Sequence, residues 1–204
     1  MPSEHIHLQI QDRILTLEIK RRDRKNALNQ AAYIALIEGL DEAEQNPDIS
    51  VVMIRGQHDL FSSGNDIKDF MEHPPTSDDT EVAKFLGSLL NFPKPLLAAV
   101  KGNAVGVGTT MLLHCDVVLA SPSANFPMPF TSLGLVPEAG SSYLFPLLVG
   151  YQRAARIFMT GESFSADQAK EMGLVTTIDS DVFEAAKKMA SQIAQQPPQA
   201  IINT

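Results

Sequence analysis

The chain begins with two short stretches in which apolar and polar residues alternate. In residues 5–10 the apolar positions Ile6, Leu8 and Ile10 share one face, and the same alternation returns in residues 15–19. A short polar break separates the two stretches. Because a period of two residues is typical of a half-buried strand, the pattern predicts a β-hairpin.

Beyond the hairpin, apolar residues recur at helical spacing in segments that alternate with short apolar runs. Asn29 is a candidate N-cap for the first helix, and Asn46 with Pro47 is expected to end it. Further helices are expected at 66–72, 81–92, 109–115, 141–149, 153–159, 165–172 and 181–196, and strands at 51–56, 96–100, 116–121 and 173–178. Residues 73–80 are expected to form a mobile surface loop and residues 124–130 an irregular segment. Alternating helices and strands favour an α/β fold with parallel pairing and helical crossovers.

Composition places the 204 residues in the class of single globular domains, which we expect to span 1–204. The formal net charge of −8 disfavours a nucleic-acid partner, which would require a basic surface. The single cysteine, Cys115, cannot form an internal disulfide, and this favours a reducing compartment such as the cytoplasm. We also expect no membrane association, since no apolar stretch approaches the length of a spanning helix.

Two glycine-bearing segments each lie between a predicted strand and a predicted helix. They are FSSGND at 61–66, the first glycine loop, and GNAVGVG at 102–108, the second glycine loop. Backbone N–H groups at such junctions favour anions and developing negative charge. The alternative is that the glycines only permit tight turns. The second loop lacks the third glycine of a dinucleotide fingerprint and the Lys-Ser/Thr pair of a P-loop.

Five segments, in one order and over nearly the whole chain, resemble the crotonase (enoyl-CoA hydratase/isomerase) superfamily. They are RKNALN at 24–29, FSSGNDIKDF at 61–70, FPKPLLAAVKGNAVGVGTTMLLHCDVVLAS at 92–121, SLGLVPEAGSSYLFP at 132–146 and TGESFSADQAKEMGLV at 160–175. The resemblance implies a spiral of ββα units that binds an acyl-CoA thioester. Because the family usually carries further C-terminal helices, we expect the C-terminal helical region to be shortened.

The resemblance also implies which residues hold the substrate. Two backbone N–H groups, of Asn65 and Val107, are expected to polarise the thioester carbonyl as an oxyanion hole. Residues expected to bind the rest of the substrate are Lys25, Ala27, Leu28, Ser62, Ser63, Gly64, Asp66, Ile67, Lys68 and Gly106. Without the resemblance, the lysines in this set would be interpreted as ordinary solvated surface.

The acid or base decides which reaction the family site performs. Hydratases of the family use two glutamates, whose positions fall here on Thr110 and Phe130, and neither side chain replaces a carboxylate. Glu138 instead occupies the position at which Δ3,Δ2-enoyl-CoA isomerases, in particular the peroxisomal type, carry one acidic residue. One base suffices to move a double bond. The alternative for Glu138 is a carboxylate that only pairs with a nearby N–H at a helix end.

We therefore expect isomerisation of 3-enoyl-CoA to trans-2-enoyl-CoA in the oxidation of unsaturated fatty acids, with no metal or separate cofactor, since CoA is part of the substrate. Hydration or thioester hydrolysis at the same site, and a catalytically silent acyl-CoA-binding protein, are the alternatives. Because the family is usually trimeric and helices such as TTMLLHC and IFMTG are strongly apolar, we expect a homotrimer or a dimer of trimers.

Overall fold

The computed structural model describes residues 4–74, 77 and 79–203, and it begins with the predicted hairpin. Strands β1 (Ile6–Gln11) and β2 (Ile14–Ile19) pair antiparallel. Asp12 and Arg13 both have positive φ, 52° and 65°, so the two-residue turn matches the right-handed twist of the strands. The expected common face is only partly buried, since Ile6 is 1% exposed but Ile10 is 52% exposed.

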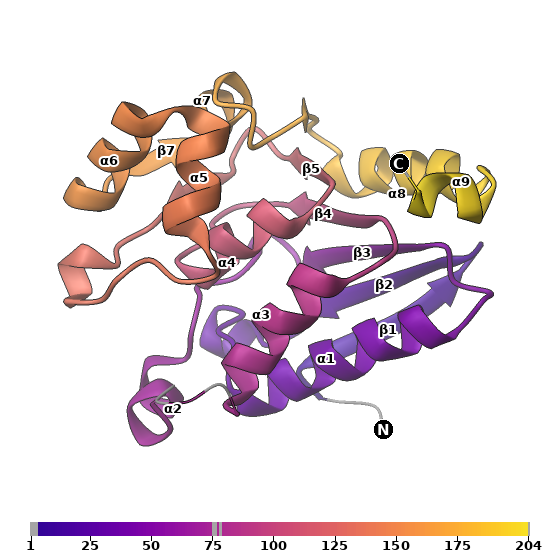
Figure 1. Cartoon of the computed structure of the whole chain (residues 1–204), viewed down its shortest axis with the longest axis horizontal. Helices are drawn as coiled ribbons and strands as arrows, with labels where there is room; N and C mark the ends of the chain where they lie inside the picture. The colour runs from indigo at the N-terminus through magenta and orange to yellow at the C-terminus, as the bar shows by residue number, and fades with distance from the viewer. Residues whose placement is uncertain (1–3, 75–76, 78, 204) are drawn as a thin grey trace.

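A six-stranded sheet runs through the molecule in the order β1-β2-β3-β4-β5-β8 (Figure 1). The strands after the hairpin are β3 (Val51–Gly56), β4 (Leu96–Val100), β5 (Val117–Ala120) and β8 (Thr177–Ile178). Every pairing from β2 to β8 is parallel, and most of the crossovers contain helices. The predicted α/β fold with parallel pairing is therefore confirmed.

Nine α-helices lie in the described part of the chain, and helices pack on both faces of this sheet. They are α1 (Gln30–Gln45), α2 (Ile67–Glu72), α3 (Glu81–Asn91), α4 (Val107–Thr110), α5 (Ser141–Val149), α6 (Tyr151–Thr160), α7 (Ala166–Glu171), α8 (Val182–Ala194) and α9 (Pro198–Ile202). Helix α8 packs on one face through a small core that includes Met53 and Ala186. The larger core on the other face includes residues of α1 and α3, such as Leu36 and Phe85. The loops at the edge of this larger core carry the candidate site.

Local signals account for the helix ends. The Asn29 side chain accepts a hydrogen bond from the Ala32 N–H at 3.0 Å, which confirms the predicted cap of α1. The helix expected at 109–115 has other bounds in the structure. It begins at Val107 and continues as a 3₁₀ helix over Met111–His114. Helix α9 has no counterpart in the sequence pattern.

The segment 124–130 is not irregular as predicted, because it contains strand β6 (Asn125–Pro127). This strand pairs antiparallel with β7 (Ser163–Ser165), and the Phe126 and Phe164 rings stack with centroids 5.4 Å apart. The prolines in the segment hide the strand signal. Of the loop expected at 73–80, residues 75, 76 and 78 lie outside the described residues. Within the described part of the chain, no helix is both long and apolar enough to span a membrane.

Candidate active site

The first glycine loop contains the backbone N–H group of Asn65, the first of the two predicted donors. The Gly64 carbonyl accepts a hydrogen bond from the Leu28 N–H at 2.8 Å. Because the C=O and N–H of a trans peptide point in opposite directions, the Asn65 N–H points away from Leu28. Among the described residues it meets no acceptor. Gly64 has a φ of +86°, and a Cβ there would lie 2.7 Å from the Val105 carbonyl oxygen, so glycine is required.

The second glycine loop repeats this arrangement at the start of α4. The Gly106 carbonyl accepts from the N–H groups of Thr109 and Thr110 at 2.8 and 2.9 Å. The N–H of Val107, in the same peptide as that carbonyl, points the other way and has no acceptor in the described part of the chain. As the first residue of a helix, Val107 also lies at the positive end of the local backbone dipoles.

Backbone bonds hold the two glycine loops side by side. Ser62 receives a hydrogen bond from the Val105 N–H at 2.9 Å and donates its own N–H to the Asn103 carbonyl at 3.1 Å. A Cβ at Gly108 would lie 3.2 Å from that of Ser62, so α4 packs directly against the first loop. The structure thus brings together the two peptides that carry the predicted donors.

Glu138 reaches the same place from the segment that precedes α5. Its Oε1 accepts a hydrogen bond from the Thr110 hydroxyl at 2.6 Å, three residues beyond Val107 on α4. Its Oε2 is buried and has no hydrogen-bond partner among the described residues. Burial raises the pKa of Glu138 to about 6, although the Thr110 hydrogen bond opposes the rise. The carboxyl group is thus a weaker acid than an exposed glutamate and has one oxygen available.

The backbone beside Glu138 is held in an unusual conformation. Ala139 has a φ of +55°, which is uncommon for a residue with a side chain. Its carbonyl pairs with His114 Nε2 at 2.8 Å, and since a carbonyl only accepts, this nitrogen carries the proton. The Ser141 N–H donates to the Glu138 carbonyl at 2.9 Å. These two hydrogen bonds fix the turn that carries the Glu138 side chain. The role of His114 in holding this turn was not predicted from the sequence.

The predicted substrate-binding residues of the 24–29 turn lie against the first glycine loop. Ser63 donates its N–H to the Lys25 carbonyl at 3.1 Å, and the Ser62 hydroxyl donates to the Asn26 carbonyl at 2.8 Å. Ala27 and Leu28 are buried, and the N–H and carbonyl of Leu28 pair with the Gly64 carbonyl and the Asp66 N–H of the first glycine loop. The structure therefore joins these two segments into one surface.

Asp66, Ile67 and Lys68 continue this surface along the start of α2. The Asp66 carboxylate caps α2 through the Lys68 N–H at 3.2 Å and pairs with Arg21 at 2.6 Å. Ile67 is 66% exposed, and the Lys68 ammonium, also exposed, lies 3.9 Å from the Glu72 carboxylate. Because Arg21 and the helix N–H groups occupy the Asp66 carboxylate, its side chain has a local structural role.

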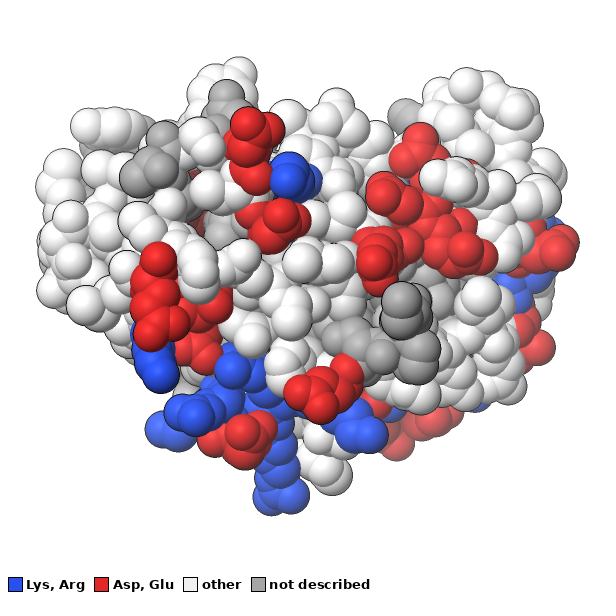
Figure 2. Space-filling model, turned by 90° about the horizontal axis from the view of Figure 1, so that it is seen from below, with Lys and Arg blue, Asp and Glu red and all other residues white. Residues whose placement is uncertain are grey.

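Basic residues are concentrated in the basic turn, residues 20–25. Lys20, Arg22, Arg24 and Lys25 are all exposed there. Figure 2 shows most of the Lys and Arg side chains on its face gathered in one group, whereas Asp and Glu side chains are spread widely. An acidic protein thus carries one local surface that favours phosphate groups.

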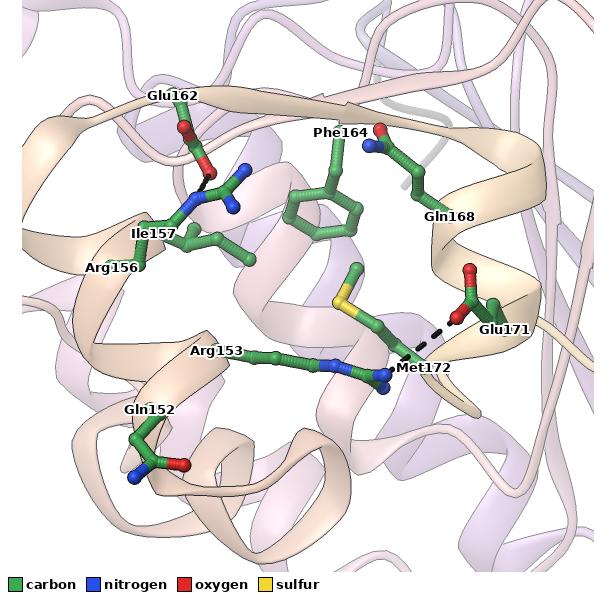
Figure 3. Close-up of a pocket in the computed structure, with 9 residues that line it drawn as sticks. All are labelled: Gln152, Arg153, Arg156, Ile157, Glu162, Phe164, Gln168, Glu171 and Met172. Atoms are coloured by element: carbon green, nitrogen blue, oxygen red, sulfur yellow. Dashed lines mark hydrogen bonds and ion pairs between the residues drawn. The ribbon is translucent and has the colours of Figure 1, made fainter.

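Two surface hollows differ in their relation to the predicted site, and one of these two is lined by predicted site residues. A hollow of about 230 Å³ is lined in part by Leu28, Tyr33 and Asn65. The other, of about 340 Å³, lies between α6 and α7 and contains none of the predicted residues (Figure 3). In the second hollow Arg156 pairs with Glu162 and Arg153 with Glu171, at 2.6 and 3.6 Å. Since each guanidinium faces a carboxylate, the second hollow has no unbalanced charge with which to hold a phosphate.

Most of the chain matches a known protein family. Residues 9–203 match the family described as Enoyl-CoA hydratase/isomerase. The chain is 37% identical to the 2,3-dehydroadipyl-CoA hydratase of Escherichia coli over 94% of its own length and 76% of that protein. It is 34% identical to human Enoyl-CoA delta isomerase 2, again over 94% of this chain but over 50% of that protein. The chain thus spans about half the length of this second relative.

Solved structures agree with the fold that the resemblance implies. The structure of Pseudomonas aeruginosa OdaA superposes with a TM-score of 0.95 at 43% identity, over 98% of this chain and 83% of that one. A putative enoyl-CoA hydratase/carnithine racemase from Magnetospirillum magneticum also gives 0.95, at 37% identity, over 98% and 80% of the two chains. The predicted crotonase-like fold is confirmed, and the chain belongs to the enoyl-CoA hydratase/isomerase family of crotonase-superfamily enzymes.

Proposed function

We propose that this protein isomerises 3-enoyl-CoA to trans-2-enoyl-CoA. The observation that carries the proposal is the state of Glu138: a single buried carboxylate, with one free oxygen, hydrogen-bonded to the helix whose first N–H is an unpaired donor. The name of human Enoyl-CoA delta isomerase 2 supports the same reaction.

The reaction needs one carboxylate and two donors. Glu138 removes a proton from C2 of the acyl chain, and the negative charge that develops on the thioester oxygen is stabilised by the N–H groups of Asn65 and Val107. The double bond moves from C3–C4 to C2–C3 as Glu138 returns the proton to C4. Proton loss and gain balance, so no water, metal or separate cofactor enters the step.

Hydration is the competing reaction, and the E. coli hydratase among the relatives makes it worth testing. By the resemblance, hydration would need two glutamates, one at each of the positions that Thr110 and Phe130 occupy here. Thr110 instead donates its hydroxyl to Glu138, and Phe130 is buried at 6% exposure. Neither residue transfers a proton, so the site favours isomerisation.

We further propose that the CoA nucleotide lies along the basic turn and the first glycine loop. Lys25 and Lys68 are exposed on these segments, and their charges suit the phosphates of CoA. Ala27 and Leu28 follow Lys25 on the same segment, and Leu28 is hydrogen-bonded to the first glycine loop, so they complete this proposed binding segment. In this arrangement the thioester would lie next to Asn65 and the fatty chain would extend toward Glu138. We propose that the reaction serves the oxidation of unsaturated fatty acids.

The direct test mixes the purified protein with 3-hexenoyl-CoA and follows the absorbance of the conjugated thioester. We expect the absorbance to rise, and to rise much more slowly with Glu138→Gln, whose kcat should fall by ~10²–10⁴ with KM little changed. Glu138→Asp should keep part of the activity. Glu171→Gln, a change at a 73% exposed carboxylate, is the matched control and should behave as wild type.

Other outcomes identify the alternatives. Depletion of 2-hexenoyl-CoA without isomerisation would indicate a hydratase, and release of free CoA a hydrolase. Binding without turnover of any of these thioesters would indicate a silent acyl-CoA-binding protein. Near wild-type isomerisation by Glu138→Gln would exclude Glu138 as the base and move the search to Asp66 and Asp69.

A further inference from the structure

Tyr33 places a polar group inside the otherwise apolar buried face of α1. The residue is 1% exposed, and its ring packs against that of Phe85 with centroids 5.3 Å apart. Its hydroxyl donates a hydrogen bond to Asn65 Oδ1 at 2.5 Å. The phenol must be the donor, because a carboxamide oxygen only accepts. The buried tyrosine hydroxyl thus bonds the side chain of Asn65, whose backbone N–H is one of the two predicted donors.

Leu28 and Tyr33 together hold Asn65 on both sides. Leu28 donates its N–H to the Gly64 carbonyl and accepts the N–H of Asp66, both at 2.8 Å, so the peptides before and after Asn65 are fixed. Tyr33 fixes the side chain. Asparagine side chains readily accept hydrogen bonds from nearby backbone N–H groups, so an unrestrained Asn65 oxygen would compete for the donor that the site needs free.

We infer that Tyr33 is a positioning residue for the oxyanion donor: its hydroxyl occupies Asn65 Oδ1 and so keeps the Asn65 N–H free for the thioester oxygen. The inference rests on the proposed function in assigning that N–H to the thioester. Its physical basis is preorganisation, since a donor that is already aimed and unpaired needs no rearrangement as charge develops.

Two further features support this role. Tyr33, Asn65 and Leu28 line the same hollow of about 230 Å³, so the hydrogen bond lies beside open space rather than deep in the core. Burial, then the negative charges of Glu138 and Asp69, raises the pKa of Tyr33 well above its ordinary value. The hydroxyl therefore keeps its proton, and stays a donor, at neutral pH, where Glu138 is ionised.

The test removes only the hydroxyl. Tyr33→Phe should lower kcat by roughly 3- to 10-fold, the worth of one net hydrogen bond, and leave KM little changed. Thr131→Val also removes one hydroxyl hydrogen bond, to the Phe158 carbonyl, at an exposed residue outside both glycine loops, and it should leave both constants unchanged. A rise in KM at constant kcat after Tyr33→Phe would overturn the inference, since it would indicate a general loss of binding.

A double-mutant cycle separates positioning from packing. Asn65→Ala keeps the backbone N–H but removes the oxygen that Tyr33 holds, so Tyr33→Phe should cost almost nothing more in that background. If Tyr33→Phe lowered kcat equally in both backgrounds, Tyr33 would act through the packing of α1, and the inference would be wrong.

An infrared measurement makes the result independent of isomerisation. Hexanoyl-CoA has no double bond to move, and its thioester C=O stretch should shift to lower frequency on binding the wild-type protein and shift less on binding Tyr33→Phe. A wild-type shift without isomerase activity would reject the proposed function and keep this inference. Equal shifts with both proteins would reject the inference itself, whatever reaction the protein catalyses.

Discussion

Glu138, the proposed base, shows at the residue scale how a buried ionisable group costs stability. Its pKa rises from an ordinary value near 4.5 to about 6 because burial disfavours the ionised form. Between these values the folded chain holds the proton more tightly than the unfolded chain does, so stability falls as pH rises through this window. At neutral pH the ionised carboxylate is therefore a net destabilising group.

A stability measurement checks this directly. Glu138→Gln should raise the free energy of unfolding at pH 7 by about 1–2 kcal/mol relative to wild type. The gain should disappear below about pH 4.5, where both states of the wild-type protein bind the proton. Urea unfolding at pH 7 and pH 4 gives both values. A variant less stable than wild type at pH 7 would contradict the expected penalty of burial.

Thr110 tunes the same group in the opposite direction. Its hydroxyl hydrogen bond lowers the pKa of Glu138, so Thr110→Val should raise that pKa above its wild-type value of about 6. Since the base works only when ionised, kcat/KM falls as pH drops through this pKa, and the acidic limb of the profile should move to higher pH. Thr131→Val removes a hydroxyl that bonds the Phe158 carbonyl and should leave the limb in place. An unmoved limb in Thr110→Val would show that the hydrogen bond does not control the base.

At the scale of elements, the site is made by two strand-to-helix loops rather than by side chains. Each loop fixes a peptide through its carbonyl, and the N–H of that peptide has no acceptor among the residues that the structure describes. Gly106 has φ 56° and ψ −118°, a conformation that belongs almost only to glycine, and nothing lies within 4 Å of where its Cβ would be. An alanine there would therefore act through the backbone alone.

Gly106→Ala should rotate the peptide that carries the Val107 donor and lower kcat by ~10²–10³, the effect of losing one oxyanion donor. Gly134→Ala is the matched control: its φ is also positive, 70°, and the space around its Cβ is also open, but it lies outside both glycine loops. The control should lose some stability and keep its kcat. Steady-state kinetics on the two variants makes the comparison, and equal activities would show that the second glycine loop tolerates the change.

At the scale of the whole molecule, α5 and α6 carry exposed apolar side chains. Tyr143, Leu147, Tyr151 and Met159 are each about 70% exposed, and they follow Val136, which is 82% exposed. The expectation that TTMLLHC forms an interface is wrong for its first half, because residues 109–112 are buried within the chain. The α5–α6 surface is the better candidate for contacts between copies.

We propose that copies of the chain associate through this surface as a homotrimer or a dimer of trimers. Light scattering at micromolar concentration should give a mass of at least three chains, and Leu147→Lys should shift it toward one. Leu90→Lys makes the same change on α3 at an equal exposure of 69%, and it should leave the mass unchanged. A wild-type protein that scatters as a monomer would reject the proposal.

The sequence by itself determined the features that depend on neighbours a few residues away. Periods of two and of 3.6 placed the hairpin and most of the helices, Asn29 marked the cap of α1, and the glycine loops were recognisable between strand and helix. Glu138 was singled out through the resemblance, because it occupies the position at which Δ3,Δ2-enoyl-CoA isomerases carry one acidic residue. Strand β6 was missed because its partner lies in a distant segment.

Only the tertiary structure decided which groups meet. Tyr33 shares the helical spacing of the apolar residues of α1, so its pattern alone cannot distinguish a core residue from one that holds Asn65. The bond from Thr110 to Glu138 joins residues 28 positions apart, and the bond from Tyr33 to Asn65 joins residues 32 apart. Periodicity and capping act between residues within one or two helical turns of each other. These two hydrogen bonds form only after the sheet and its helices have packed. Their effects on the Asn65 N–H and on the Glu138 carboxylate are therefore properties of the fold.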